Sequence, residues 1–270
     1  MPGELDPIYV AARRALLDAI EALQHHIEAV VLVGAQAIYL HTGEGDLAVA
    51  PYTTDGDFAL APSDLPDAPL LAEALSGAHF TPNKQPGSWR SAEGVVIDIM
   101  VPAALGGPGS RGARLGAHGN RAARKARGLE AALVDRSKMR INSFEPGDPR
   151  NFEIWVAGPA ALLIAKLHKL GERAHQPTRR DNKDALDILR ILRQIPTRDL
   201  AEATKRLLAD PFSAEVTSAA LSILQSLFAT PDADGCQMAV KATEGLEDPE
   251  EISRSCALLA ADLLAASPHR

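Results

Sequence analysis

Short apolar runs and amphipathic stretches alternate through the first 157 residues of the chain. Apolar residues recur at helical spacing over 7–23, and the β-branched run at 29–33, which ends at Gly34, is typical of a buried strand. Further strand patterns lie at 58–60, 94–101, 139–144 and 152–156, and helical patterns at 35–41 and 69–76. Strands mixed with helices predict an α+β (α/β) fold, a mixed sheet with flanking helices.

Beyond Gly158 the apolar residues keep a helical spacing almost to the end of the sequence. Pro159 suits the first turn of a helix, and the pattern predicts helices that end near residues 171, 195, 209, 228, 244 and 266. We therefore predict two domains, a mixed domain over 1–157 and a helical domain over 158–270.

The segment 102–128 differs from its surroundings in composition. It contains seven glycines, six Arg or Lys residues and no acidic residue. Its glycine-rich part predicts a mobile loop, and its arginine-rich part a short helix or a solvated loop. An alternative is that these cations steer a polyanion such as tRNA, mainly through its phosphates because aromatic residues are missing there.

Composition and charge restrict the class of protein. Hydrophobic residues make up 46% of the chain, which excludes a disordered protein, and the net charge of −7 argues against a general coat of basic residues. The charged residues near the N-terminus exclude a signal peptide, and the apolar runs are too short to span a bilayer. Cys236 and Cys256 have no companion metal ligands and are expected to be reduced thiols. We expect a cytoplasmic protein without a membrane partner.

Three aspartates form the main chemical signal. Asp55 and Asp57 are two residues apart in an extended segment, so both carboxylates face the same side of a sheet. Asp98 lies inside the apolar strand 95–101, where an isolated charge is costly to bury. A shared pair of Mg²⁺ (or Mn²⁺) ions, suited to nucleotidyl transfer, would satisfy all three carboxylates. The alternatives are a solvated turn at Asp55–Asp57 and a solvent-facing Asp98.

Gly34 and a later helical segment supply candidate phosphate ligands. A glycine between a strand and a helix lets backbone N–H groups approach a phosphate. Lys166, Lys169 and Arg173 share one helical face and could receive a triphosphate, although a solvated basic stripe has the same spacing. Asp184 and Asp187 share a face of the next helix, where Asp187 and Lys183 could equally form a surface pair.

These motifs resemble a known superfamily. The segments 31–37 (VLVGAQA) and 53–58 (TTDGDF), with the later strand that carries Asp98, resemble the DNA-polymerase-β-like nucleotidyltransferases. The segments 162–173 (LLIAKLHKLGER) and 183–189 (KDALDIL) look like the abortive-infection (AbiEii-like) nucleotidyltransferases, which are toxins of type IV toxin–antitoxin systems. The resemblance covers roughly residues 28–195.

The resemblance implies a nucleotidyltransferase fold that moves a nucleoside monophosphate from an NTP to an acceptor. It implies metal binding by the three aspartates, a catalytic, phosphate-binding Lys166, and an RNA acceptor such as the 3′ end of a tRNA, together with a cognate antitoxin. The nucleotide-binding residues it implies, with the spacing arguments above, are Gly34, Ala35, Thr54, Lys166, Lys169, Arg173, Asp184 and Asp187.

Two other functions stay open. The acidic net charge suits a cationic small molecule, as in the aminoglycoside-modifying nucleotidyltransferases. The pair Gly34-Ala35, where the family usually has Gly-Gly or Gly-Ser, favours a catalytically silent fold that serves as a binding module.

Overall fold

The computed structural model describes the chain except for residues 1–4, 44–46, 110, 175–181 and 268–270. The described residues form a mixed α+β structure with one eight-stranded sheet. Its strands follow the order β3-β4-β5-β2-β1-β8-β7, and β6 pairs with β5 beside this path. Parallel and antiparallel pairs both occur, so the predicted mixed sheet with flanking helices is confirmed.

The chain divides into two compact units, which differ from the predicted domains in two short segments. The first unit comprises residues 1–37, 52–129 and 136–157, and contains the sheet. The second comprises 38–51, 130–135 and 158–270, and is helical. The helix α2 (Gly34–Thr42) therefore begins in the first unit and ends in the second, and α4 (Glu130–Val134) belongs to the helical unit although β7 and β8 follow it in the sequence.

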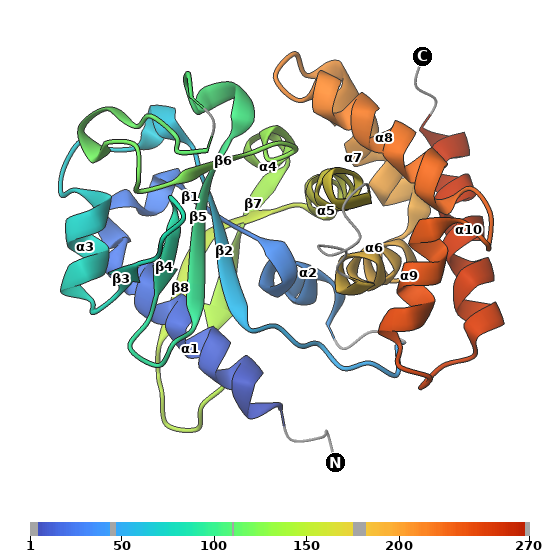
Figure 1. Cartoon of the computed structure of the whole chain (residues 1–270), viewed down its shortest axis with the longest axis horizontal. Coiled ribbons are helices and arrows are strands. Elements are labelled where there is room, and N and C mark those ends of the chain that lie inside the picture. The colour runs from blue at the N-terminus through green and yellow to red at the C-terminus, as the bar shows by residue number, and fades with distance from the viewer. Residues whose placement is uncertain (1–4, 44–46, 110, 175–181, 268–270) are drawn as a thin grey trace. The chain divides into compact units, whose positions relative to one another are not determined.

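Most of the sheet strands were visible in the sequence pattern. Those predicted are β1 (Val30–Val33), β2 (Asp55–Leu60), β5 (Val96–Pro102), β7 (Arg136–Asn142) and β8 (Asn151–Ala157). The short strands β3 (Thr81–Pro82), β4 (Ser88–Arg90) and β6 (Arg124–Ala126) were not predicted. In Figure 1, β1, β2 and β5 lie side by side, with β1 antiparallel and β5 parallel to β2. β2 and β5 carry the three candidate aspartates, and β1 ends directly before Gly34.

The helix α1 (Pro7–Ala22) covers one face of β2 and β5. Its contact is so close that a Cβ atom added at Gly56 would lie 3.0 Å from the Cδ1 atom of Leu16 and 2.9 Å from that of Ile97. Gly56 therefore faces α1, and the alternation of side chains along a strand places Asp55 and Asp57 on the opposite face. The glycine between the two aspartates is explained by helix packing.

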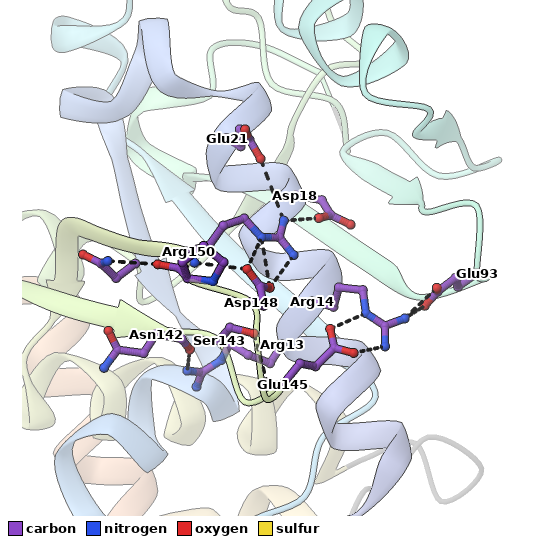
Figure 2. Close-up of polar contacts among 12 residues, drawn as sticks. Arg13, Arg14, Asp18, Glu21, Glu93, Asn142, Ser143, Glu145, Asp148 and Arg150 are labelled. Atoms are coloured by element: carbon purple, nitrogen blue, oxygen red, sulfur yellow. Dashed lines mark hydrogen bonds and ion pairs between the residues drawn. The ribbon is translucent and has the colours of Figure 1, made fainter.

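Ion pairs hold the polar side of α1 to two loops of the sheet, as Figure 2 shows. Arg14 donates to Glu93, in the turn between β4 and β5, and to Glu145, in the turn between β7 and β8, with N–O distances of 2.6 Å. Arg150, which precedes β8, binds both Asp18 of α1 and Asp148 of its own turn. These contacts fix α1 against the sheet from its solvent side.

The described residues of the segment 102–128 pack partly into the structure and include the strand β6, where the sequence predicted a loop and a short helix. Its residues Ala113, Leu115, Ala122 and Ala123 are buried, and the indole N–H of Trp89 donates to the carbonyl of Ala122 at 3.2 Å. β6 pairs with the end of β5 in parallel, in the register Met100–Arg124. Small apolar residues between the glycines and arginines therefore anchor this segment to the sheet edge.

The second unit is a group of packed helices. Besides the end of α2 and α4, it contains α5 (Pro159–Ala174), α6 (Asn182–Gln194), α7 (Thr197–Ala209), α8 (Ala214–Phe228), α9 (Asp234–Ala242) and α10 (Pro249–Ala266). Asp248 caps α10 by accepting hydrogen bonds from the next turn. Cys236 of α9 and Cys256 of α10 are buried free thiols. None of the helices in the described part of the chain is both long and apolar enough to cross a lipid bilayer.

Candidate functional site

The candidate site of the first unit is built on neighbouring strands of the sheet. Asp57 of β2 and Asp98 of β5 are register partners in a parallel pair, so their side chains project side by side from the same face. Asp55 lies two residues earlier on that face, opposite Val96. Asp55 and Asp57 are half-buried, and the side chain of Asp98 is 24% exposed. Three carboxylates thus share the face of the sheet that α1 does not cover.

Gly34 lies directly beside one of these carboxylates. It follows Val33, the register partner of Asp57, and has a φ of +72°. A Cβ atom added at Gly34 would lie 2.2 Å from the Oδ2 atom of Asp57, which is closer than any real contact of that kind. The position therefore requires glycine for two reasons, its backbone conformation and the neighbouring carboxylate. The start of α2 is thereby brought against Asp57.

Asp98 is held by an arginine that sequence reasoning assigned to a loop. Nη2 of Arg124 donates to Oδ2 of Asp98 at 2.9 Å, and the two side chains are 30% and 24% exposed. The other oxygen of Asp98, Oδ1, is buried and has no hydrogen-bond partner among the described residues. A buried carboxylate oxygen without a partner is costly, so this atom is a candidate ligand position.

Thr53 and Thr54, the two residues before β2, differ in their surroundings. Oγ1 of the fully buried Thr53 donates to Oδ1 of Asp55 at 2.6 Å and so orients that carboxylate. The predicted nucleotide-binding residue Thr54 is exposed, and the predicted Ala35 is buried at the start of α2. Thr53 is thus a site residue that the sequence interpretation passed over, although it stands in the same motif. The alternation of side chains along an extended segment was the available signal, because it places Thr53 with Asp55 and Thr54 on the other side.

The oxygen atoms of this face suit a hard divalent cation. No group of three or more His, Cys, Asp or Glu side chains, within the residues that the structure describes, is arranged to hold a metal ion. All three predicted ligands make interactions within the chain: Thr53 binds Asp55, Arg124 binds Asp98, and Asp57 also has a partner. Magnesium, however, is commonly held by one or two carboxylates with substrate phosphates completing its shell. Asp57 with the free Oδ1 atom of Asp98 therefore fits the chemistry of magnesium.

Comparison with known proteins adds no relative: no protein-family model matches the chain, and no curated protein matches it. The function of the chain is therefore inferred from its residues and their geometry.

A second cluster of charged residues lies in the helical unit, between α5 and α6. Nζ of Lys166 donates to Oδ1 of Asp184 and to Oδ2 of Asp187, both at 2.7 Å. Lys169 and Arg173, one and two turns further along α5, also bind Asp184, at 3.0 and 3.1 Å. The hydroxyl of Tyr39 donates to Asp187 at 3.3 Å. The five residues predicted to bind nucleotide in this part of the chain thus bind one another.

Burial and neighbouring charges have opposite effects on the pKa values in this second cluster. Burial opposes the charge of Lys166, but the fields of Asp187 and Asp184 outweigh it and hold the pKa of Lys166 well above its ordinary value. Burial likewise opposes the charge of Asp184, yet the neighbouring cations hold the pKa of Asp184 well below its usual range. Lys166 and Asp184 are therefore both charged at neutral pH, and they form a buried ion pair.

The predicted site residues thus form two groups. Gly34, Asp55, Asp57 and Asp98 come together on one face of the sheet in the first unit, with Thr53 and Arg124 as additional members. Lys166, Lys169, Arg173, Asp184 and Asp187 come together in the second unit. Their phosphate-binding role stays a prediction, because the ammonium of Lys166 is already bound by two carboxylates.

Proposed function

We propose that the chain is a metal-dependent nucleotidyltransferase with a nucleotidyltransferase fold, which transfers a nucleoside monophosphate from an NTP to an acceptor and releases pyrophosphate. The observation that carries the proposal is the placement of Asp57 beside Asp98, with Gly34 against Asp57 and the Oδ1 atom of Asp98 left without a partner among the described residues. In this proposal the two carboxylates would bind the cation, and the start of α2 beside them would bind the phosphates.

Each residue has a separate task in this proposal. Asp57 and Asp98 would hold Mg²⁺ or Mn²⁺, and Asp55, oriented by Thr53, completes the acidic face. Gly34 lies against the carboxylate of Asp57, and the backbone N–H groups at the start of α2 would meet the phosphates next to it. Asp98 also accepts the proton of the attacking hydroxyl as the new bond to the α-phosphorus forms and the bond to pyrophosphate breaks. The bound cation would supply neutralisation of the triphosphate charge.

The acceptor that we favour is a polyanion such as RNA. The sequence between Asp98 and Glu130 contains six Arg or Lys residues and no acidic residue, and it contacts Asp98 through Arg124. Such a segment attracts phosphates, whereas a cationic aminoglycoside would be repelled by it. A tRNA as the particular RNA, and a cognate antitoxin as partner, stay predictions from the family resemblance.

A catalytically silent binding module is the second candidate. The specific observation in its favour is that Asp98 is paired with Arg124, and that no three-residue metal group is formed by the described residues as they stand. In this alternative the carboxylate face would be neutralised permanently, and a nucleotide would bind without transfer.

The test is the variant Asp57→Asn, which keeps the shape of the side chain but removes the charge that attracts a cation. Neighbouring carboxylates repel one another, so removing one charge should leave the metal-free melting temperature unchanged or slightly raised. Mg²⁺ with NTP should stabilise the wild type, and this increment should shrink in the variant. Transfer of label from NTPs to total cellular RNA should fall by orders of magnitude.

The matched control is Asp67→Asn, which removes the same charge from an exposed position in the same unit and should leave both readouts unchanged. If Asp57→Asn transfers label as fast as the wild type, the proposed catalytic role is wrong. If the wild type binds Mg²⁺-NTP but transfers nothing to RNA or to aminoglycosides, the silent binding module is the correct function.

A further inference from the structure

The arginine bound to Asp98 is held in place by its backbone. Arg124 opens β6 and pairs with Met100 of β5, and Gly112 forms an isolated antiparallel bridge to it. Gly87 (φ +72°) packs beneath it, so closely that an added Cβ atom would lie 2.5 Å from the backbone nitrogen of Arg124. The pairing of β6 with β5 therefore positions the side chain of Arg124 next to Asp98.

Arg124 also differs from four of the other cations of its segment. It makes an ion pair with a carboxylate, whereas Arg121 and Lys125 donate to backbone carbonyls. Arg111 and Arg114 are exposed, and neither has a carboxylate partner among the described residues. A permanent pair between Arg124 and Asp98 would occupy one carboxylate oxygen only, which leaves the buried Oδ1 atom unsatisfied. This pair is therefore incomplete as a purely structural contact.

We propose that Arg124 is a built-in counter-charge for Asp98, which competes with the divalent cation and turns to the triphosphate when metal and nucleotide bind together. The inference rests on the proposed function of the same face. It assigns Arg124 to regulation of metal loading: the guanidinium neutralises Asp98 while the site holds no nucleotide, and the phosphates then provide it with a new anionic partner. Its 30% exposure leaves the side chain room to change partners.

The sign of the effect distinguishes this role from structural support. A cation placed 2.9 Å from a carboxylate repels a second cation at that carboxylate. Removing the guanidinium should therefore tighten the binding of a free divalent cation. If Arg124 only supported Asp98, its removal would loosen the carboxylate and weaken cation binding. The two roles predict changes in opposite directions.

The experiment measures Mn²⁺ binding to the full chain by calorimetry, without nucleotide and then with a non-hydrolysable NTP analogue. We expect Arg124→Gln to bind free Mn²⁺ about tenfold tighter than the wild type, a gain that shrinks as salt screens the charges. With the analogue present the gain should disappear, because the phosphates lose their guanidinium partner. Arg114→Gln is the matched control, since it removes the same charge from an exposed side chain of the same segment.

Two further variants secure the interpretation. Arg124→Met keeps the aliphatic part of the side chain and should give the same tightening if Arg124→Gln folds poorly. In a protein that also carries Asp98→Asn, Arg124→Gln should leave the Mn²⁺ affinity unchanged. Unchanged or weaker Mn²⁺ binding in both Arg124 variants would overturn the counter-charge role, even if the wild type transfers nucleotides. If Arg124→Gln binds Mn²⁺ more tightly but the wild type transfers no nucleotide, the counter-charge role is supported and the proposed function fails.

Discussion

Replacing Lys166 by Met tests whether the charged cluster of the helical unit stabilises the fold. The change removes two charge-assisted hydrogen bonds of 2.7 Å and leaves the side chains of Asp184 and Asp187, 2% and 1% exposed, without their shared ammonium. Asp184 keeps Lys169 and Arg173, whereas Asp187 keeps the neutral hydroxyl of Tyr39. Breaking a buried ion pair from one side costs about 3–5 kcal/mol, and we expect a loss in that range.

Urea unfolding followed by far-UV circular dichroism at neutral pH measures this loss. Both tryptophans, Trp89 and Trp155, lie in the first unit, so fluorescence follows that unit separately. Lys169→Met is the matched control: its side chain is 43% exposed and makes one bond of 3.0 Å, so its removal should cost at most about 1 kcal/mol. A Lys166→Met protein as stable as this control would show that the cluster does not stabilise the fold, and our reasoning about burial would fail.

Two other predictions follow from single positions. Gly34→Ala should destabilise the first unit by about 2 kcal/mol or more, because a side chain there needs a positive φ and collides with Asp57; a melting temperature equal to that of the wild type would refute the close approach. Burial and the nearby His118 lower the pKa of His26 from 6.5 in the folded chain. The unfolded chain therefore binds a proton at His26 more readily than the folded chain does. The stability present above pH 6.5 should be lost as the pH falls towards the folded pKa. In His26→Gln the free energy of unfolding should fall less steeply with decreasing pH, by up to about 1.4 kcal/mol per pH unit. The same pH dependence in variant and wild type would contradict this prediction.

Local patterns were enough to predict the strands that carry the three aspartates. The helices α7 and α8 agree with the predicted ends at residues 209 and 228, because their apolar stripes and ends are local signals. The β-branched run before Gly34 and the apolar strand around Asp98 were also recognised correctly. From the two strands alone, however, the register that places Asp57 beside Asp98 could only be guessed, because strand pairing joins distant residues.

The partners of the charged residues could not be predicted from the same patterns. Helical spacing placed Lys166, Lys169 and Arg173 on one face, but that face binds carboxylates 11 to 21 residues away in the sequence. β6 has three residues, too few for an alternating pattern, so the pairing that brings Arg124 to Asp98 left no local sign. In both cases the polar contact joins residues that are distant in the sequence. The spacing of apolar residues indicates which side chains are buried, but not which polar side chains pair.

The outer edge of β5 has a consequence for association between copies of the chain. β4 covers the first part of this seven-residue strand and β6 the last part, and between them the N–H of Ile99 donates to the carbonyl of Gly87. A long unpaired strand edge is the surface on which foreign strands add and aggregates grow, and the interruption removes it. A side chain at residue 87 would separate these strands from β5, so substitution there should cause aggregation before it affects any chemistry.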